Sequence, residues 1–422
     1  MMRRFLEKVF SLGSIQAAQM LLPLLALPYL SRTLGKESFG IVMYLGVVTL
    51  VMTFVLDWGF LLGGVRCVAR QRGRREALSG LWWHGLLAKA LLLPPLIGGG
   101  VLFFFLFPHP SFSPLAMFWA SLAGIARGFS PLWFFQGKDD DSLRRLAVYD
   151  LASTALLLLL MVVLIRGPED ASLYLALLAL SKIGAYGLLC LRTCRAYCFR
   201  PTVSGALALL RETRVFFVGG IAGQTYSNWS QLGIGGILPA REMGLFLAAD
   251  KISRAIVSMS NPLSQALFPE ICALHGLDDA ARRLRLQRMA LLAALLASAG
   301  GCALVELLAP AILQLALGQA SEDAVLILRL LALVIPLLSL NQILGPQLLV
   351  PKGKEHVVTL AQICAAVVSI PTALTLTFFF GLPGAAALPL LAEGCIFIIL
   401  CMGIYRHCPE QIPFFQSRNS GT

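Results

Sequence analysis

The sequence predicts an all-α polytopic membrane protein with about twelve transmembrane helices. Hydrophobic residues make up 58% of the 422 residues and charged residues only 13%, about half the charged fraction of soluble domains. The apolar residues also form continuous runs of about 20, the length that crosses a bilayer. Continuous runs exclude a membrane β-barrel, whose strands alternate. The composition likewise excludes a soluble enzyme, a disordered chain and a fibrous protein.

The apolar runs, separated by polar breaks, define the expected spans. They lie near residues 11–30, 40–62, 81–107, 114–135, 147–166, 172–191, 215–237, 244–268, 289–311, 324–350, 357–381 and 384–405. The basic start MMRRFLEKVF resembles the beginning of a signal peptide. The apolar run after it is long, however, and no small-x-small cleavage site ends it, so we interpret it as the first permanent span.

The basic residues alternate between the two sets of loops. One set, with both termini, holds 24 Lys and Arg residues, whereas the other holds only Arg32, Lys36, Arg166 and Arg241. Such an excess marks the cytoplasmic side, so we expect both termini in the cytoplasm of a bacterial cell, beneath its cytoplasmic (inner) membrane. Orientation also accounts for the net charge of +12, and we expect no nucleic-acid partner.

The two halves of the chain carry a short repeat. Phe39-Gly40 and Met243-Gly244 each open a predicted span, and they are 204 residues apart. Six spans separate them, so both halves have the same orientation, as in transporters built from parallel repeats. We therefore expect two six-helix lobes, residues 1–200 and 201–422.

Short loops argue against an enzyme. The outward loops leave no room for a catalytic domain, and no GxxxxGK[ST] motif for nucleotide binding occurs. No carboxylate pair or His/acid constellation points to chemistry on a lipid-linked sugar, and we expect no cofactor and no metal site.

Ionisable residues inside the spans are the strongest functional pointers, because each costs roughly 2.5–3.5 kcal/mol to insert. The bases outnumber the acids: Lys89, Arg127, Lys182, Lys251, Arg254 and Arg329 against Asp57, Asp250, Glu306 and Glu393. A basic interior suits an anionic headgroup such as a phosphate or pyrophosphate. We favour a structural role for three of these residues, Lys89, Arg329 and Asp57. The ammonium group of Lys89 is expected to reach the membrane surface. Asp150 is set aside as a helix-end residue.

Depth separates the remaining candidates. Lys182 and Arg254 each lie roughly 15 Å into their spans, at the membrane midplane. Asp250 and Arg254 are four residues apart and share a helix face, while Lys251 points about 100° away. An ion pair that only stabilises packing remains an alternative for this group.

Four stretches resemble the Wzx-type O-antigen and polysaccharide biosynthesis flippases of the multidrug/oligosaccharidyl-lipid/polysaccharide exporter superfamily. They are LLALPYLSRTLGKESFGIV ending at Val42, WFFQGKDD at 133–140, GLFLAADKISRAI…NPLSQALFPEI at 244–271 and LLVPKGKEH at 348–356. The resemblance implies a V-shaped, MATE-like fold that moves undecaprenyl-pyrophosphate-linked oligosaccharide from the inner to the outer leaflet by alternating access. It also implies contact with the polysaccharide polymerase machinery.

The resemblance assigns substrate binding to Arg32, Lys251 and Arg254, which match its motifs. Burial adds Arg127 and Lys182 as substrate-binding candidates, and Asp250 and Glu393 are candidates for ion coupling or ion pairing. Many relatives carry an acid in the seventh span, where this chain reads YSNWSQLGIG, so coupling through that position is not expected. A MATE-like ion-coupled drug exporter is the main alternative, and a lipid-scrambling or structural role stays open.

Overall fold

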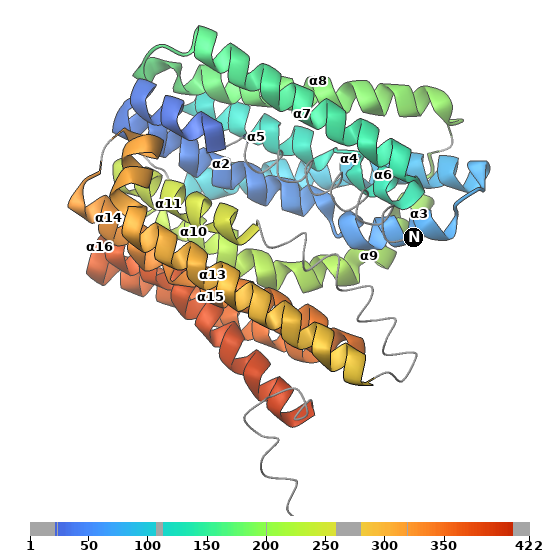
Figure 1. Cartoon of the computed structure of the whole chain (residues 1–422). Coiled ribbons are helices and arrows are strands. Elements are labelled where there is room, and N and C mark those ends of the chain that lie inside the picture. Colours follow the sequence, from blue (N-terminus) through green and yellow to red (C-terminus); the bar gives the residue numbers. More distant parts are fainter. Residues whose placement is uncertain are drawn as a thin grey trace, which may run out of the picture. The chain divides into compact units, whose positions relative to one another are not determined.

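The computed structural model describes residues 22, 24–106, 113–199, 201–258, 280–318 and 320–407, and all regular structure within these ranges is helical (Figure 1). The prediction of an all-α protein is confirmed. Contact density divides the chain into two compact units. The N-terminal unit comprises Leu25–Gln224 with Leu238–Gly244, and the C-terminal unit comprises Thr225–Ile237 with the described part of Leu245–Thr422. A lobe boundary at residues 200/201 stays a prediction.

The N-terminal unit begins with helical residues 25–33. Its elements are α2 (Gly35–Asp57), the π-helical turn η1 (Phe60–Gly64), α3 (Val65–Arg70), α4 (Arg75–Leu106), α5 (Pro114–Gly128), α6 (Leu132–Lys138), α7 (Asp140–Leu164), the 3₁₀ turn η2 (Pro168–Asp170), α8 (Ala171–Ala196) and α9 (Val203–Gln224). The first turn of α11 (Ala240–Ser258) also belongs to this unit.

The C-terminal unit contains the remainder of α11. Its other elements are the π-helical turn η3 (Thr225–Trp229), α10 (Ser230–Ile234), α13 (Ala280–Leu317), α14 (Glu322–Ala332), α15 (Val334–Ile343), the π-helical turn η4 (Leu344–Leu349), the 3₁₀ turn η5 (Val350–Lys352) and α16 (Glu355–His407). Within α16, Gly381 has φ 60° and ψ −135°, a conformation that favours glycine. This residue splits α16 into the two spans expected on either side of it.

Seven helical stretches of the described chain are long and apolar enough to cross a membrane. They are Gly35–Asp57, Arg75–Phe105, Asp141–Leu164, Pro168–Ala196, Leu284–Leu317, Glu322–Lys352 and Glu355–Arg406. The last corresponds to two expected spans. Two further expected spans are interrupted and are not among the seven: span 114–135 breaks between α5 and α6, and span 215–237 breaks at η3. The expected spans 11–30 and 244–268 extend partly outside the described residues. The twelve expected spans and these seven stretches therefore agree.

Hydrogen bonds identify the two ends of the N-terminal unit. The Tyr29 hydroxyl donates to the carbonyls of Val162 and Ile165 at 3.1 and 2.7 Å, satisfying oxygens that the end of α7 leaves free. At the other end, Arg72 donates to the Gly137 carbonyl at 2.6 Å and joins two loops. The first bond brings the chain near residue 30 beside the end of α7, and the second brings the loops after α3 and α6 together; the orientation across the membrane stays a prediction.

Candidate functional site

A buried ion pair joins α7 and α8 in the N-terminal unit. The Lys182 ammonium donates to Asp150 Oδ1 at 2.7 Å, to Thr154 Oγ1 at 3.1 Å and to Ser153 Oγ at 3.3 Å. The Tyr186 hydroxyl donates to the same Asp150 oxygen at 2.7 Å. All three ammonium hydrogens of Lys182 have protein acceptors in this arrangement. A substrate phosphate would have to displace one of them.

The position of Asp150 corrects the interpretation of the sequence. Polar residues at the start of α7 hide the helix from a hydropathy pattern, so the span was expected to begin at residue 147. The helix in fact begins at Asp140, capped by the Asp139 carboxylate, which accepts from the Ser142 N–H at 2.6 Å. Asp150 therefore lies about 15 Å along α7, within the span rather than at its end.

Arg127 supplies a second positive charge to this region. It is half-buried in the last turn of α5 and lies close enough to interact electrostatically with Asp150 and Lys182. Its guanidinium has no hydrogen-bond partner among the described residues. With two bases to one acid, this group, the N-terminal cluster (Arg127, Asp150, Lys182 and Tyr186), has a net charge of +1.

Lys89 has a structural position, as expected, but its ammonium does not reach the membrane surface. The side chain is 2% exposed, and its ammonium donates to the carbonyl of Gly128 at 2.6 Å. Gly128 is the last residue of α5, so Lys89 satisfies a free carbonyl at the negative end of that helix. The ammonium also lies 5.3 Å from the centre of the Phe60 ring.

A second ion pair lies in the C-terminal unit. Arg254 Nε is 3.0 and 2.8 Å from the two carboxylate oxygens of Asp250, which confirms that the two residues share a face of α11. The Gln231 amide also donates to Asp250, at 3.1 Å. The two terminal NH₂ groups of Arg254 have no hydrogen-bond partner within the part of the chain that the structure describes.

Glu393 provides a third buried charge, from α16. Its Oε2 accepts from the Asn341 amide at 2.8 Å, and its carbonyl accepts from the same amide at 3.0 Å. The side chain is 2% exposed, yet Oε1 has no partner among the described residues. Tyr226, in the π-helical turn η3, interacts with both Glu393 and Arg254. Turns of this type are frequent at functional sites. We call Tyr226, Gln231, Asp250, Arg254 and Glu393 the C-terminal cluster.

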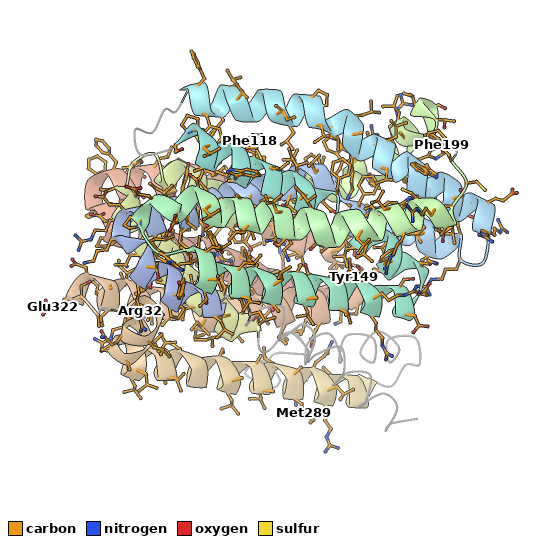
Figure 2. The ribbon with its side chains drawn as sticks, turned by 90° about the horizontal axis from the view of Figure 1, so that it is seen from above. Arg32, Phe118, Tyr149, Phe199, Met289 and Glu322 are labelled. Atoms are coloured by element: carbon orange, nitrogen blue, oxygen red, sulfur yellow. The ribbon has the colours of Figure 1, made fainter. Side chains whose placement is uncertain are left out.

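Two predicted binding residues lie outside these clusters. Arg32 is exposed, and Figure 2 shows it at the opposite end of the N-terminal unit from Phe199. Lys251 is exposed on α11, on a different face from its neighbour Asp250. Sequence reasoning missed Asp150, Tyr186 and Asn341. Tyr186 and Asn341 are polar side chains within apolar runs, and this is the signal that could have found them. The pattern alone does not identify their partners.

The chain resembles known proteins over most of its length. A protein of Escherichia coli strain K12 named "Putative O-antigen transporter" is 24% identical over 412 residues, which cover 95% of this chain and 96% of that protein. The solved structure of an inward-facing multidrug resistance MATE family transporter of the MOP superfamily superposes with a TM-score of 0.74 at 16% identity, covering 92% of this chain and 95% of that one. A lipid II flippase in an inward-closed conformation gives a TM-score of 0.71 at 10% identity, covering 94% and 87%.

These findings confirm a multi-pass membrane protein with a MATE-like fold, and the proteins it resembles are described as transporters or flippases. Residues 5–275 match the family described as "Polysaccharide biosynthesis protein". That match includes three of the four stretches that carried the resemblance in the sequence. The chain therefore belongs to the polysaccharide biosynthesis protein family.

Proposed function

We propose that this protein is a flippase for undecaprenyl-pyrophosphate-linked oligosaccharide, the repeat unit of an O antigen or another polysaccharide. It carries the headgroup from the inner to the outer leaflet of a bacterial cytoplasmic membrane by alternating access, and the polyprenyl tail stays in the lipid. The family match and the transporter relatives support this function. Both termini face the cytoplasm, residues 1–200 and 201–422 form the two lobes, and the polysaccharide polymerase machinery receives the product.

One observation carries the proposal: in each unit, a guanidinium within an expected span keeps hydrogen-bond donors that no described residue uses. Arg254 is fixed through Nε by Asp250, and both of its NH₂ groups remain available. Arg127 lies close enough to Asp150 to interact with it electrostatically, and its guanidinium has no hydrogen-bond partner among the described residues. A guanidinium offers two parallel donors that match a phosphate group. Such contacts replace the water that a pyrophosphate loses on entering the membrane.

The other cations take supporting roles. Lys182 holds Asp150 in place and thereby sets the field around Arg127. Lys251, exposed beside the pair on α11, attracts the headgroup toward Arg254. Arg32, at the opposite end of the N-terminal unit from Phe199 (Figure 2), meets the headgroup as it leaves on the outer side.

Glu393 is the residue we assign to ion coupling. A buried carboxylate with one unpartnered oxygen is costly as an anion, so binding a proton or a cation stabilises it. Arg254 and Tyr226 link this carboxyl group electrostatically to the Asp250–Arg254 pair. Protonation of Glu393 therefore changes the field at the guanidinium proposed to hold the phosphate.

Binding to the purified protein tests the proposal. We expect undecaprenyl-pyrophosphate-linked oligosaccharide to bind in preference to the monophosphate carrier, and Arg254→Ala to weaken binding by about 10- to 100-fold, because hydrogen bonds to charged groups contribute about 1.5–3 kcal/mol each. Arg329→Ala is the matched control, since Arg329 is an exposed arginine paired with Glu306 at 3.6 Å. Equal binding of both carriers would contradict the proposal.

A drug exporter is the alternative. It draws support from the two buried acids of the C-terminal cluster, which outnumber its single arginine. Efflux of a cationic dye from cells, abolished by Glu393→Gln, would favour that function. Absence of dye efflux together with pyrophosphate-selective binding supports the flippase.

A further inference from the structure

A basic cavity lies at one end of the N-terminal unit, and its lining shares no residue with the two clusters. Its volume is about 430 Å³, and its lining includes Arg72, Arg75, Lys138, Asp139 and Tyr197. Three bases and one acid give it a net charge of +2. The lining comes from the turn between α3 and α4, the junction of α6 and α7, and the end of α8.

Local structure holds these residues in place. Gly73 has a φ of +81°, which permits the tight turn that brings Arg72 and Arg75 to the same cavity. Gly137 lets α6 approach α3, because a Cβ there would lie 2.7 Å from the Val65 carbonyl oxygen. The close approach allows the Arg72 Nε to donate to the Gly137 carbonyl at 2.6 Å. The glycine of the WFFQGKDD stretch thus serves to build this cavity.

The basic groups keep donors for a ligand. Arg72 uses only Nε on the protein, and Arg75 uses one terminal nitrogen, which lies 3.2 Å from the Ala196 carbonyl. Neither side chain has another hydrogen-bond partner among the described residues. Lys138 lies 3.7 Å from Asp139, too far for a strong hydrogen bond, and 5.7 Å from the centre of the Tyr197 ring.

A neighbouring cavity of about 360 Å³ provides a contrast. Its lining includes Arg70 and Glu212, whose charged groups are 3.7 Å apart. The charges there are balanced within the protein, and the cavity has no surplus to offer an anion. Of these two cavities of the described chain, the one around Arg72, Arg75 and Lys138 carries the surplus of positive charge.

The surroundings place the basic cavity at the membrane surface. Aromatic side chains gather at this end of the unit, as they do at the boundary between lipid and water: Trp83 packs edge-on against Phe199 with ring centres 4.7 Å apart, and Tyr197 packs edge-on against Phe134 at 5.5 Å. Figure 2 shows Phe199 at this end of the N-terminal unit. The loops here belong to the set rich in Lys and Arg, which marks the leaflet facing the cytoplasm.

We propose that this cavity is a binding site for a phosphate group, supplied by the headgroup of an anionic phospholipid of the cytoplasmic leaflet. Basic pockets at the ends of transmembrane helices recognise such headgroups. The bound lipid ties the α3–α4 turn, the start of α4 and the end of α6 together through Arg72, Arg75 and Lys138. The site is separate from the transport site and does not depend on the proposed flippase activity.

Lipid retention tests the inference. The protein is purified from nanodiscs that contain phosphatidylglycerol and phosphatidylcholine, and the lipids retained are counted by native mass spectrometry. We expect selective retention of phosphatidylglycerol and a loss of at least about tenfold in Arg72→Gln/Arg75→Gln. Arg74→Gln is the matched control, because Arg74 lies between the two arginines, is exposed and does not line the cavity.

Further arms distinguish the source of the phosphate. Inorganic phosphate is titrated against the protein in phosphatidylcholine nanodiscs. Saturable binding that the double variant loses, without enrichment of phosphatidylglycerol, supports a phosphate site but overturns the lipid as its source. If the double variant does not fold, Lys138→Gln replaces it. Equal retention of phosphatidylglycerol in wild type, the cavity variants and Arg74→Gln would overturn the inference.

Discussion

Gly40 and Gly244 are in direct backbone contact. A Cβ added at Gly244 would lie 2.6 Å from the Cα of Gly40, and one added at Gly40 would lie 1.7 Å from the carbonyl oxygen of Ala240. The two glycines are 204 residues apart, at the beginnings of two expected spans, and both belong to the N-terminal unit. The first turns of α2 and α11 pack closely only because neither residue has a side chain.

A side chain at this crossing should therefore destabilise the protein. We expect Gly244→Leu to lower the free energy of unfolding by about 1–3 kcal/mol or more through overpacking. The measurement is thermal unfolding in detergent. Gly46→Ala is the control, since nothing lies within 4 Å of that position in α2 and alanine favours a helix by about 1 kcal/mol over glycine. Equal melting temperatures for Gly244→Leu and wild type would contradict the close contact.

The Lys182–Asp150 pair predicts a pattern of single and double variants. Lys182→Met leaves the Asp150 carboxylate, whose side chain is 20% exposed, without its hydrogen-bonded cation. We expect a loss below the roughly 3–5 kcal/mol of a fully buried pair. The double variant Lys182→Met/Asp150→Leu removes both charges, so we expect it to recover most of that loss. Thermal unfolding of the wild type, Lys182→Met, Asp150→Leu and the double variant measures the coupling. A double variant that is less stable than Lys182→Met would show that the pair does not behave as a unit.

The Asp250–Arg254 pair should separate stability from transport. Asp250→Asn/Arg254→Gln keeps the shape of the pair without its charges and should unfold close to the wild-type temperature. Transport should nevertheless be lost, because the guanidinium for the phosphate is gone. Comparison of melting temperature and flux in this variant tests the assignment. Wild-type flux would assign the pair to packing alone.

Glu393 should control the response of transport to an ion gradient. Glu393→Gln keeps the hydrogen bond from Asn341 to an amide oxygen but binds no proton or cation. We expect flux in this variant to become independent of a proton or sodium gradient. Glu306→Gln, on the partly exposed acid that pairs with Arg329, should respond to the gradient as the wild type does. Gradient-driven flux in Glu393→Gln would place coupling elsewhere.

Asp139 predicts a pH dependence of stability outside the membrane spans. Burial raises the pKa of Asp139. Hydrogen bonds from Ser142 and the charges of Lys138 and Arg145 lower it, and together they outweigh burial, so the pKa lies below its ordinary value. A lowered pKa contributes stability that is present above the ordinary value of about 3.9 and is lost as the pH falls through the shifted value. Asp139→Ala should cost about 0.5–2 kcal/mol at neutral pH through loss of the helix cap.

Thermal unfolding from neutral to acidic pH measures this effect. The difference between wild type and Asp139→Ala should be constant near neutral pH and should shrink below about pH 3.9. Asp139→Asn retains a capping side chain, so it should remain close to wild type at neutral pH. A difference that grows on acidification would contradict the lowered pKa.

The spans and the helix-local pair were predictable from the sequence, and the long-range partners were not. Twenty apolar residues in a row have few alternatives to a membrane helix, and a spacing of four fixes Asp250 and Arg254 on one face. The contact between Asn341 and Glu393 joins residues 52 positions apart, which no local pattern specifies. The break of the seventh span into a π-helical turn at Tyr226 also has no composition signal.

Asp150 illustrates a different limit. Hydropathy locates the apolar part of a helix, but the polar first turns of α7 continue the same helix toward the membrane surface. In the sequence, Asp139 and the charged residues after it have the composition of a loop, although they cap and begin α7. The depth of a polar residue was therefore underestimated where the helix extends beyond its apolar segment.

Movement of the headgroup across a bilayer tests the central claim most directly. Proteoliposomes with labelled undecaprenyl-pyrophosphate-linked oligosaccharide report how quickly the label changes leaflet, with and without a proton or sodium gradient. We predict protein-dependent movement that Arg254→Ala abolishes and Arg329→Ala leaves intact. Movement at the rate of empty liposomes, or unchanged flux in Arg254→Ala, would contradict a flippase that holds its substrate through this arginine.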